Sequence, residues 1–291
     1  MIYADKNTGI IVQGATGRQG SFHINLMNQY AREVGGTGVV AGVTPGKGGT
    51  IVHDIPVYSS VRDAIKNHDA TTTVMFVPGS AAGDSIMEAA DAGIELVVAV
   101  TEHIPVHDVM RAIAYADTKG CQVIGPNCPG ILSPGECSLG IMPSHLYRRG
   151  NVGVISRSGT LTYEVVHELS RAGIGQSTVV GIGGDPVIGQ TFVDVIHRFF
   201  EDTETKAVVL LGELGGNLEE EGALTAQECD IPVVVFIAGT TAPPEKRMGH
   251  AGAIVSGGEG DAITKIKRLQ AIGIPVASRL STIPSIIQEL L

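Results

Sequence analysis

Short apolar runs alternate with amphipathic stretches along most of the chain. Helical periodicity marks residues 80–93 and 107–120, and the apolar runs between such stretches are rich in β-branched side chains. Apolar strands separated by helices are typical of parallel sheets covered on both faces, and right-handed crossovers then give an open, doubly wound α/β sheet. In the first half of the chain the pattern predicts strands at Ile10–Gln13, Val39–Val43, Thr73–Val77, Leu96–Val100 and Gln122–Ile124.

A stretch rich in proline and glycine, GPNCPGILSPGECSLGIMPS at residues 125–144, interrupts this alternation. We interpret it as the connection between two domains, which predicts a first domain at 1–125, a linker at 126–150 and a second domain at 151–291. Strands that build a second α/β sheet are predicted at Val152–Ser156, Val179–Ile182, Ala207–Leu211, Val233–Ile237 and Ala253–Val255.

Composition excludes several classes of function. The net charge of −10, the absence of Trp and an aromatic content of 4% disfavour nucleic-acid binding. No apolar run approaches the ~20 residues that span a bilayer, and the start of the chain does not resemble a secretory signal. The four cysteines form no CxxC pair, which favours a cytoplasmic protein with reduced thiols over a zinc site, another metal centre or a disulfide framework.

Glycines follow the first predicted strand in QGATGRQGSFH. Gly14, Gly17 and Gly20 are spaced as GxxGxxG, and a helix is predicted to begin near Ser21. Backbone amides at such a turn and at a helix N-terminus bind anions, so the loop predicts a phosphate site. The alternative is that the glycines serve only close packing of the turn.

The loop after the second strand disfavours NAD, because it lacks the acid that would hold the ribose hydroxyls. It carries Lys47 instead, in TPGKGGT, which suits an additional phosphate as in NADP or the ADP moiety of coenzyme A; a solvated lysine is the alternative. Thr101 and Glu102 follow another strand and are candidate ligand contacts. For Asn127 and Cys128 a rigid interdomain turn is favoured over a catalytic thiol.

In the second domain, Ser156 and Ser158 lie in SRSG at a predicted strand-to-helix junction that Gly159 relieves. Such hydroxyls either cap the helix or, with the helix dipole, hold a phosphoryl group. The GxSxG pattern of serine hydrolases is absent.

Glu213 is expected at the carboxyl end of a strand, and the EEE run that follows it is interpreted as a solvated helix start. His250 lies among small residues in RMGHAGA, either in an ordinary surface turn or in a loop that bulky groups approach. If these loops meet, a histidine oriented by a carboxylate beside an anion site predicts phosphohistidine chemistry.

Seven segments in the same order resemble one family: QGATGRQG, GVTPGKGG, IGPNCPG with SPGEC, SRSGTLTYE, GIGGDPVIG, GELGG with EEE, and KRMGHAGAI. The chain is similar over nearly its whole length to the α subunits of succinyl-CoA synthetase (succinate–CoA ligase). The resemblance implies a Rossmann-like CoA-binding domain followed by a flavodoxin-like ligase domain. It also implies a β subunit, in an αβ or α2β2 assembly, that binds most of the ATP or GTP with Mg2+.

The resemblance also implies roles for individual residues. His250 is the phosphorylated residue, Glu213 is its carboxylate partner, and Tyr163 meets the substrate at the subunit junction. The helix that begins at Ser156, Ser158 and Gly159 helps to hold phosphate. The residues implied in CoA binding are Thr16, Gly17, Arg18, Gln19, Lys47, Val100, Thr101 and Glu102, with Asn127 and Cys128 near the thiol end.

Pro244, Glu245 and Glu259 depart from the family pattern, and the two glutamates place negative charge near the His250 loop. Three other functions stay open: a related acyl-CoA ligase acting on acetate or malate, a CoA- or NADP-binding module without catalysis, and an NADP oxidoreductase. The last leaves the His250 loop without a role. Neither the choice between ATP and GTP nor the preferred direction follows from this sequence.

Overall fold

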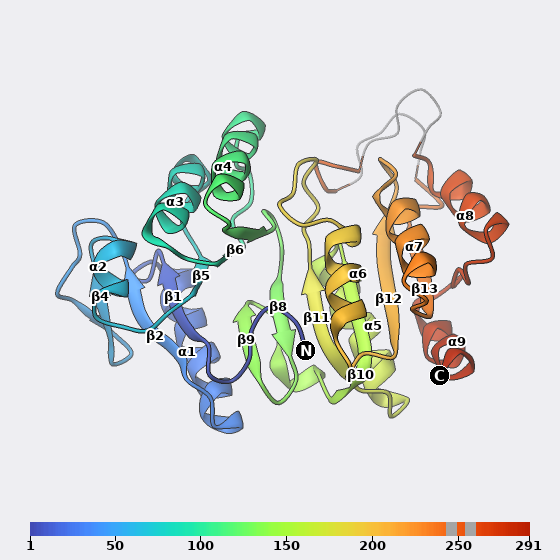
Figure 1. Ribbon diagram of the computed structural model, residues 1–291, viewed down its shortest axis with the longest axis horizontal. Coiled ribbons are helices and arrows are strands. Elements are labelled where there is room, and N and C mark those ends of the chain that lie inside the picture. Colours follow the sequence, from blue (N-terminus) through green and yellow to red (C-terminus); the bar gives the residue numbers. More distant parts are fainter. Residues whose placement is uncertain (243–248, 254–259) are drawn as a thin grey trace. The chain divides into compact units, whose positions relative to one another are not determined.

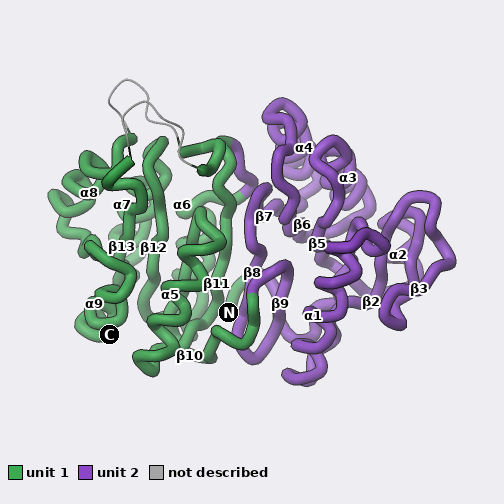
Figure 2. Tube along the Cα trace, turned by 180° about the vertical axis from the view of Figure 1, so that it is seen from behind, with its two compact units in different colours: residues 1–2, 143–186, 190–291 green, residues 3–142, 187–189 purple. Residues whose placement is uncertain are grey.

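The computed structural model describes residues 1–242, 249–253 and 260–291. The chain divides into two compact units, which Figure 2 distinguishes by colour. Unit 2 contains residues 3–142 and 187–189, and unit 1 contains residues 1–2, 143–186 and 190–291. Each unit is described by itself.

Unit 2 is built on a sheet with the strand order β3-β4-β2-β1-β5-β6-β7. All neighbours are parallel except β3 and β4, which form an antiparallel hairpin. The strands are β1 (Gly9–Gln13), β2 (Gly38–Val43), β3 (Ile51–Val52), β4 (Ile55–Tyr58), β5 (Thr72–Met75), β6 (Leu96–Ala99) and β7 (Gln122–Ile124). The helices are α1 (Arg18–Val34), α2 (Val61–Ile65), α3 (Gly79–Ala92) and α4 (Val106–Thr118).

This order runs outward in both directions from β1, so the connections change direction between β1 and β5. That is the topological switch point at which open α/β sheets bind ligands, outside the carboxyl ends of their strands. The five strands predicted for this half are present, with ends shifted by a few residues. The β3–β4 hairpin was not predicted, because Ile51 is exposed and the strand is too short to show a period.

Residues 126–150, which the sequence analysis assigns to a linker, contain regular structure. The antiparallel hairpin of β8 (Gly130–Ser133) and β9 (Cys137–Gly140) lies there and belongs to unit 2. Every residue of both strands is buried, including Cys137. The proline- and glycine-rich composition therefore reflects turns at the ends of a buried hairpin.

Unit 1 contains the parallel strands β13-β12-β10-β11 in that order. Numbered within the unit this is 2-1-3-4, the beginning of the flavodoxin-like order, with the parallel bridge between Val235 and Val276 on the outer side of β13. The strands are β10 (Arg149–Ser156), β11 (Gln176–Gly181), β12 (Ala207–Glu213) and β13 (Val233–Ala238). The helices are η1 (Ser144–Leu146), α5 (Gly159–Arg171), α6 (Phe192–Glu201), α7 (Leu218–Glu228), α8 (Ala262–Ala271), η2 (Leu280–Thr282) and α9 (Ile283–Leu290).

Helices cover both faces of this second sheet. Helices α6 and α7 pack against each other, and α5 packs against α9 (Figure 1). Strand β12 is buried along its whole length, as expected of a central strand in a parallel sheet. Four of the predicted strands are present; of the fifth, Ala253 lies in no strand and residues 254–255 lie outside the described residues.

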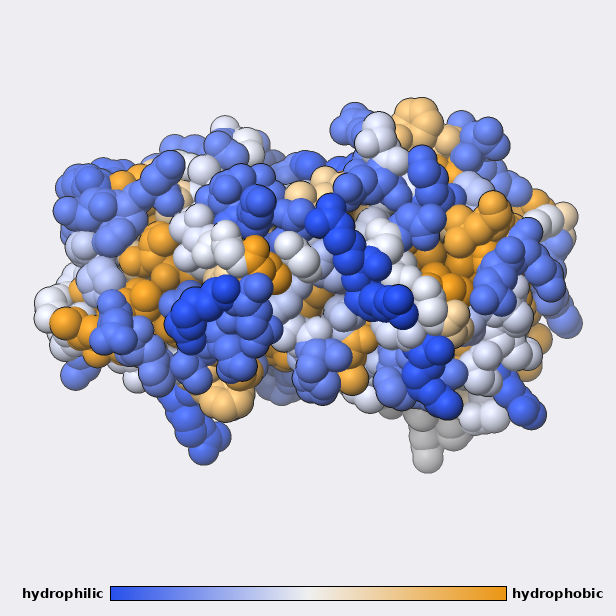
Figure 3. Space-filling view, turned by 90° about the horizontal axis from the view of Figure 1, so that it is seen from below, coloured by the Kyte–Doolittle hydropathy of each residue, from blue (hydrophilic) through white to orange (hydrophobic). Residues whose placement is uncertain are grey.

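None of the described helices has the length and apolar character needed to cross a membrane. On the face seen in Figure 3, hydrophilic residues predominate and the hydrophobic ones lie in separate groups.

Candidate active site

The side chains of Glu213 and His250 are hydrogen-bonded at the carboxyl end of β12. Nδ1 of His250 lies 2.8 Å from Oε2 and 3.0 Å from Oε1 of Glu213. Because a carboxylate only accepts, the hydrogen of the ring is on Nδ1. This tautomer leaves a lone pair on Nε2 of neutral His250, which is the nitrogen that is available as a nucleophile.

The small residues around His250 make room for its ring. A Cβ on Gly184, in the loop after β11, would collide with the imidazole. The amide of Gly252 donates to the carbonyl of Gly184 (3.0 Å), which joins the His250 segment to that loop. The His250 side chain is 27% exposed, so the ring is packed on one side and accessible on the other. These contacts favour a loop built around the ring over an ordinary surface turn.

Arg157 joins the loop after β10 to the same pair. Its guanidinium is almost completely buried, with Nη2 3.4 Å from Oε1 of Glu213 and Nη1 3.2 Å from Oε1 of Glu219. Nη1 also donates to the carbonyl of Gly215 (3.3 Å). The Arg157 side chain thus connects two carboxylates and the turn that follows β12.

Glu219 and Lys265 form a completely buried ion pair beneath this turn. Nζ of Lys265, on α8, donates to the carbonyl oxygens of Glu213 (3.0 Å) and Gly215 (2.8 Å) and to Oε2 of Glu219. Oε1 of Glu219, on α7, accepts from the amide of Glu213 (3.1 Å). A Cβ on Gly212 would collide with the Glu219 side chain, so glycine is required there for the carboxylate to approach the strand.

The surroundings of His250 raise its pKa above the ordinary value. The main cause is the hydrogen bond to Glu213, whose charge acts in the same direction, as does the charge of Asp185. Burial and the positive charge of Arg157 oppose this rise. The carboxylate therefore makes the imidazole more basic, and the neutral, nucleophilic form gains population as the pH increases.

The residues predicted to hold phosphate lie at the start of α5. The side chain of Ser158 caps the helix by accepting from the amide of Leu161 (3.4 Å), as the capping alternative predicted. The Ser156 hydroxyl donates to the carbonyl of Ser158 (2.8 Å) and accepts from its amide (3.0 Å). Gly159 is the first residue of the helix, and Tyr163 lies half-buried on it. Arg157, between the two serines, places this helix start beside Glu213.

In unit 2, the glycine loop joins β1 to α1 as predicted. The helix begins at Arg18, and its N-cap residue, Gly17, supplies no side chain to cap the first amides. A Cβ on Gly20 would collide with the carbonyl of Gly14, whose φ of 81° lies in the left-handed region. Thr16, Gly17, Arg18 and Gln19 are exposed. The amides of Thr16 and Gly17 donate within the loop, so the first amides of the helix itself, at Arg18 and Gln19, are the candidate anion donors.

Lys47 lies in the exposed turn after β2. Thr44, at the start of this turn, accepts hydrogen bonds at Oγ1 from the amide and hydroxyl of Thr16, each 3.2 Å long. The loops that carry Thr16 and Lys47 therefore lie side by side at the same edge of the sheet.

Val100, Thr101 and Glu102 follow β6 at that edge. The amide of Asn127 donates to the carbonyl of Thr101 (3.0 Å), and Sγ of Cys128 donates to the carbonyl of Ala99 (3.3 Å). Burial of Cys128 and this bond agree with a structural turn, as the sequence suggested. The predicted CoA contacts are thus spread over four loops, those that follow β1, β2, β6 and β7.

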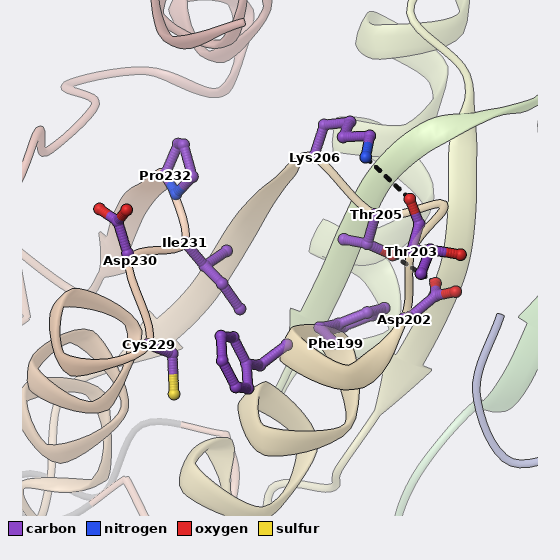
Figure 4. A pocket seen from close by; sticks show the side chains of 10 residues that line it. Phe199, Asp202, Thr203, Thr205, Lys206, Cys229, Asp230, Ile231 and Pro232 are labelled. Carbon is purple, nitrogen blue, oxygen red and sulfur yellow. Dashed lines mark hydrogen bonds between the residues drawn. The ribbon is translucent and has the colours of Figure 1, made fainter.

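A surface pocket lies at the opposite end of the unit 1 sheet (Figure 4). Two segments line it: the end of α6 with the loop before β12 (Phe199, Phe200, Asp202, Thr203, Thr205 and Lys206), and residues 229–232 before β13. Its polar groups have partners already: Lys206 donates to the carbonyl of Thr203 (2.8 Å), Thr205 donates to Asp202 (2.6 Å), and Asp202 also pairs with the amino group of Met1. Within the described residues, no group of three or more His, Cys, Asp or Glu side chains is arranged to hold a metal ion.

Sequence reasoning missed the charged residues that surround Glu213. The interpretation of the EEE run as a solvated helix start is wrong for Glu219, which is fully buried, and correct for the exposed Glu221. Lys265 has no motif, although a lysine on the apolar side of an amphipathic helix is a signal that its charge is paired. The calls on Pro244, Glu245 and Glu259 lie outside the described residues.

The chain matches two family models, one described as a CoA binding domain at residues 5–103 and one described as CoA-ligase at residues 155–274. It is 53% identical over 290 residues to an ADP-forming succinate–CoA ligase subunit alpha 2 from Archaeoglobus fulgidus, covering 100% of this chain and 99% of that protein. Identity to the corresponding subunit alpha of Staphylococcus aureus is 52% over 289 residues, which cover 99% of this chain and 94% of that protein.

Among solved structures, the chain resembles an ATP citrate lyase of Methanosaeta concilii in complex with (3S)-citryl-CoA. The TM-score is 0.89 at 26% identity over 99% of this chain, which spans 50% of the length of that larger protein. Together with full-length identity above 50%, the two family models identify the chain. It belongs to the family of succinate–CoA ligase α subunits.

Proposed function

We propose that this chain, together with a β subunit, catalyses the reversible conversion of succinate, CoA and a nucleoside triphosphate into succinyl-CoA, the diphosphate and phosphate. The observation that carries this proposal is the hydrogen-bonded pair of Glu213 and His250 beside the start of α5. The class of reaction follows from the chain's membership of the succinate–CoA ligase family. The relatives are named ADP-forming, which favours ATP as the phosphoryl donor.

The pair divides one condensation into easier steps. Nε2 of neutral His250 attacks the γ-phosphorus of the triphosphate, the bond to the bridging oxygen breaks, and the diphosphate leaves. A carboxylate oxygen of succinate then takes the phosphoryl group from Nε2 and forms succinyl phosphate. Finally the CoA thiolate attacks the acyl carbon and releases inorganic phosphate.

Glu213 has the same task in both phosphoryl transfers. By accepting a hydrogen bond from Nδ1–H, Glu213 keeps the ring in the tautomer that leaves the lone pair on Nε2. Its charge also stabilises the positive ring that forms when Nε2 bonds to phosphorus. The start of α5 is the proposed holder of the phosphoryl group, through the amide of Gly159; the Ser158 amide donates to Oγ of Ser156, which shapes the turn. Tyr163 on the same helix is the proposed contact to the substrate.

Unit 2 supplies the proposed CoA site. The match to a CoA binding domain covers the glycine loop and Lys47. The uncapped helix start at residues 16–19 suits the diphosphate of CoA, and Lys47 suits the phosphate on its ribose. Residues 100–102 with Asn127 and Cys128 line the proposed path toward the thiol. We propose that the CoA-binding domain covers residues 1–125, that residues 126–150 connect the two domains, and that the ligase domain covers residues 151–291.

The β subunit is the proposed site of ATP, or GTP, with Mg2+. The name subunit alpha of the relatives favours such a partner. Acyl phosphates hydrolyse readily, so an active site that a partner closes against water serves the intermediate.

The test is the intact mass of the chain, co-expressed with its β subunit and treated with ATP and Mg2+ near pH 8. We expect one phosphoryl adduct that maps to His250, is lost in mild acid and disappears on addition of succinate and CoA. His250→Asn, which keeps a polar side chain, serves as the negative control. An adduct that persists with succinate and CoA, or that forms in the His250→Asn variant, contradicts the proposal.

A panel of acids tests the substrate. Acetate or malate that discharges the adduct faster than succinate assigns the chain to a related acyl-CoA ligase. CoA binding without any adduct makes it a binding module, and a nicotinamide-dependent absorbance change makes it an oxidoreductase.

A further inference from the structure

The backbone of Glu213 is held from both sides by one buried ion pair. Oε1 of Glu219 accepts from the Glu213 amide (3.1 Å), and Nζ of Lys265 donates to the Glu213 carbonyl (3.0 Å). The two side chains come from α7 and α8 and bond to each other. Two further helices are therefore tied to the single residue that orients His250.

Every hydrogen-bonding group of this pair is used. The three protons of the Lys265 ammonium go to two carbonyl oxygens and to Oε2 of Glu219. Oε1 of Glu219 accepts from Arg157 as well as from the Glu213 amide. Arg157 then reaches the Glu213 carboxylate with its other terminal nitrogen. Main chain and side chain of Glu213 are thus fixed by one connected set of charges.

Such an ion pair contributes little to stability by itself. Desolvation of two fully buried charges costs several kcal/mol, and apolar residues of similar volume often serve equally well or better. Within the described part of the chain, the strongest contacts of this pair converge on the Glu213–Gly215 turn. The desolvation cost is explained if the ion pair fixes the position of this turn in a way that apolar packing does not.

We propose that Glu219 is a positioning residue for the Glu213–His250 pair, and that Lys265 and Arg157 hold its carboxylate in place. This inference rests on the proposed function of His250. Glu219 does not touch the ring; it acts through the Glu213 amide, whose position sets where the Glu213 carboxylate meets Nδ1. A displacement of about 1 Å at a reacting group lowers rates by up to about 100-fold.

Other charged groups near the pair remain in place in the variants below. Asp185, after β11, raises the pKa of His250, and Arg157 lowers it. On α7, Glu220 lies 4.0 Å from Lys265 and 3.8 Å from Arg268 of α8. A change in the pH dependence is therefore assigned by comparing variants that differ only at residue 219.

Two double variants form the test. Glu219→Gln with Lys265→Met removes both charges but keeps an oxygen that accepts from the Glu213 amide. Glu219→Leu with Lys265→Met removes that acceptor as well. Each chain is assembled with its β subunit, and the rate of His250 phosphorylation by ATP is measured in single turnovers between pH 5.5 and 9.

We expect the Leu/Met variant to react about 10- to 100-fold more slowly than the Gln/Met variant, because only the Gln/Met variant keeps an acceptor for the Glu213 amide. In the Leu/Met variant the acid limb of the rate profile also moves to lower pH, because a displaced Glu213 no longer raises the pKa of His250. Loss of folded protein alone lowers the rate at every pH and leaves the limb in place.

Gly212→Ala provides an independent route to the same displacement. An added Cβ collides with the Glu219 side chain and removes no charge, and the backbone of β12 accepts alanine. It decides the question if the Leu/Met chain does not fold. The expected result is again a slower reaction with the acid limb at lower pH.

If every variant phosphorylates His250 at the wild-type rate and with the wild-type acid limb, the positioning role of Glu219 is wrong. The proposed function is unaffected by that result as long as the wild-type chain still forms the His250 adduct. A wild-type complex that gives no His250 adduct overturns the proposed function first.

Discussion

The two sheet edges that carry the candidate sites differ in the groups they present. In unit 2 the edge presents exposed glycine turns, the uncapped start of α1 and Lys47 on the surface. In unit 1 the edge presents one histidine, and behind it lie the buried side chains of Arg157, Glu213, Glu219 and Lys265. The first edge offers backbone donors to an anion, and the second fixes the geometry of a reacting ring.

This difference follows from what each site has to do. A bound CoA needs donors for its phosphates, and amides supply them without any titration. A covalent intermediate needs one nitrogen at one position and in one tautomer, which requires a carboxylate whose own position is fixed. We therefore expect substitutions in unit 1 to affect the rate of chemistry and those in unit 2 to affect the binding of CoA.

The largest effect after loss of His250 is expected for Glu213→Gln. The amide still accepts from Nδ1, but it does not stabilise the positive ring, and it can instead donate and reverse the tautomer. Phosphorylation of His250 should slow by about 10²- to 10⁴-fold, measured by single-turnover kinetics. Glu221→Gln, an exposed position on α7, is the matched control and should be neutral. Equal rates in both variants contradict the assignment of Glu213.

Lys265→Met alone should destabilise unit 1 strongly. It leaves the buried Glu219 carboxylate without its cation, a change that costs about 3–5 kcal/mol in the free energy of unfolding. Lys267→Met, at an exposed position of the same helix, should change it by less than about 0.5 kcal/mol. Urea denaturation measures both, and an equally small effect at Lys265 shows that the pair is not desolvated as described.

Lys47→Ala should weaken CoA and spare the chemistry. Losing a charged contact of about 1.5 kcal/mol raises KM for CoA by about tenfold, whereas the phosphorylation rate of His250 stays unchanged. In the wild type, CoA lacking the ribose phosphate should show the same loss. Lys66→Ala is the control, since Lys66 pairs with Asp63 on the surface of the same unit. A slower phosphorylation in Lys47→Ala breaks the division between the two edges.

The smallest effect concerns pH and stability. Because the pKa of His250 is raised in the folded chain, its charged pair with Glu213 contributes stability that is fully present below the unfolded value of about 6.5. This contribution disappears as the pH rises through the folded pKa. The difference in Tm between wild type and His250→Asn should therefore shrink from pH 5.5 to pH 9. A constant difference contradicts the raised pKa.

Much of this arrangement is readable from sequence for a definite reason. Parallel strands buried on both faces are continuous apolar runs, and the residues after them meet at one edge, so the positions of Thr16, Lys47, Glu213 and Ser158 follow from the strand pattern. Short or exposed elements such as β3, and buried hairpins such as β8–β9 with turn-like composition, give no such period.

The charged network was not readable because burial of a charge depends on partners far away in the chain. Glu219 and Lys265 are 46 residues apart, and Arg157 is 62 residues from Glu219. In the sequence Glu219 is indistinguishable from its neighbour Glu221, which faces solvent. Only the fold shows that one of these glutamates holds the Glu213 amide.

The most direct test of the account is which ring nitrogen of His250 carries the phosphoryl group. Phosphorus–proton correlation NMR of the phosphorylated complex, digested under alkaline conditions to preserve the adduct, distinguishes the two isomers. Because Nδ1 is bonded to Glu213, the account predicts phosphate on Nε2 alone. Phosphate on Nδ1 contradicts it, since Glu213 would then have to leave the ring before the reaction.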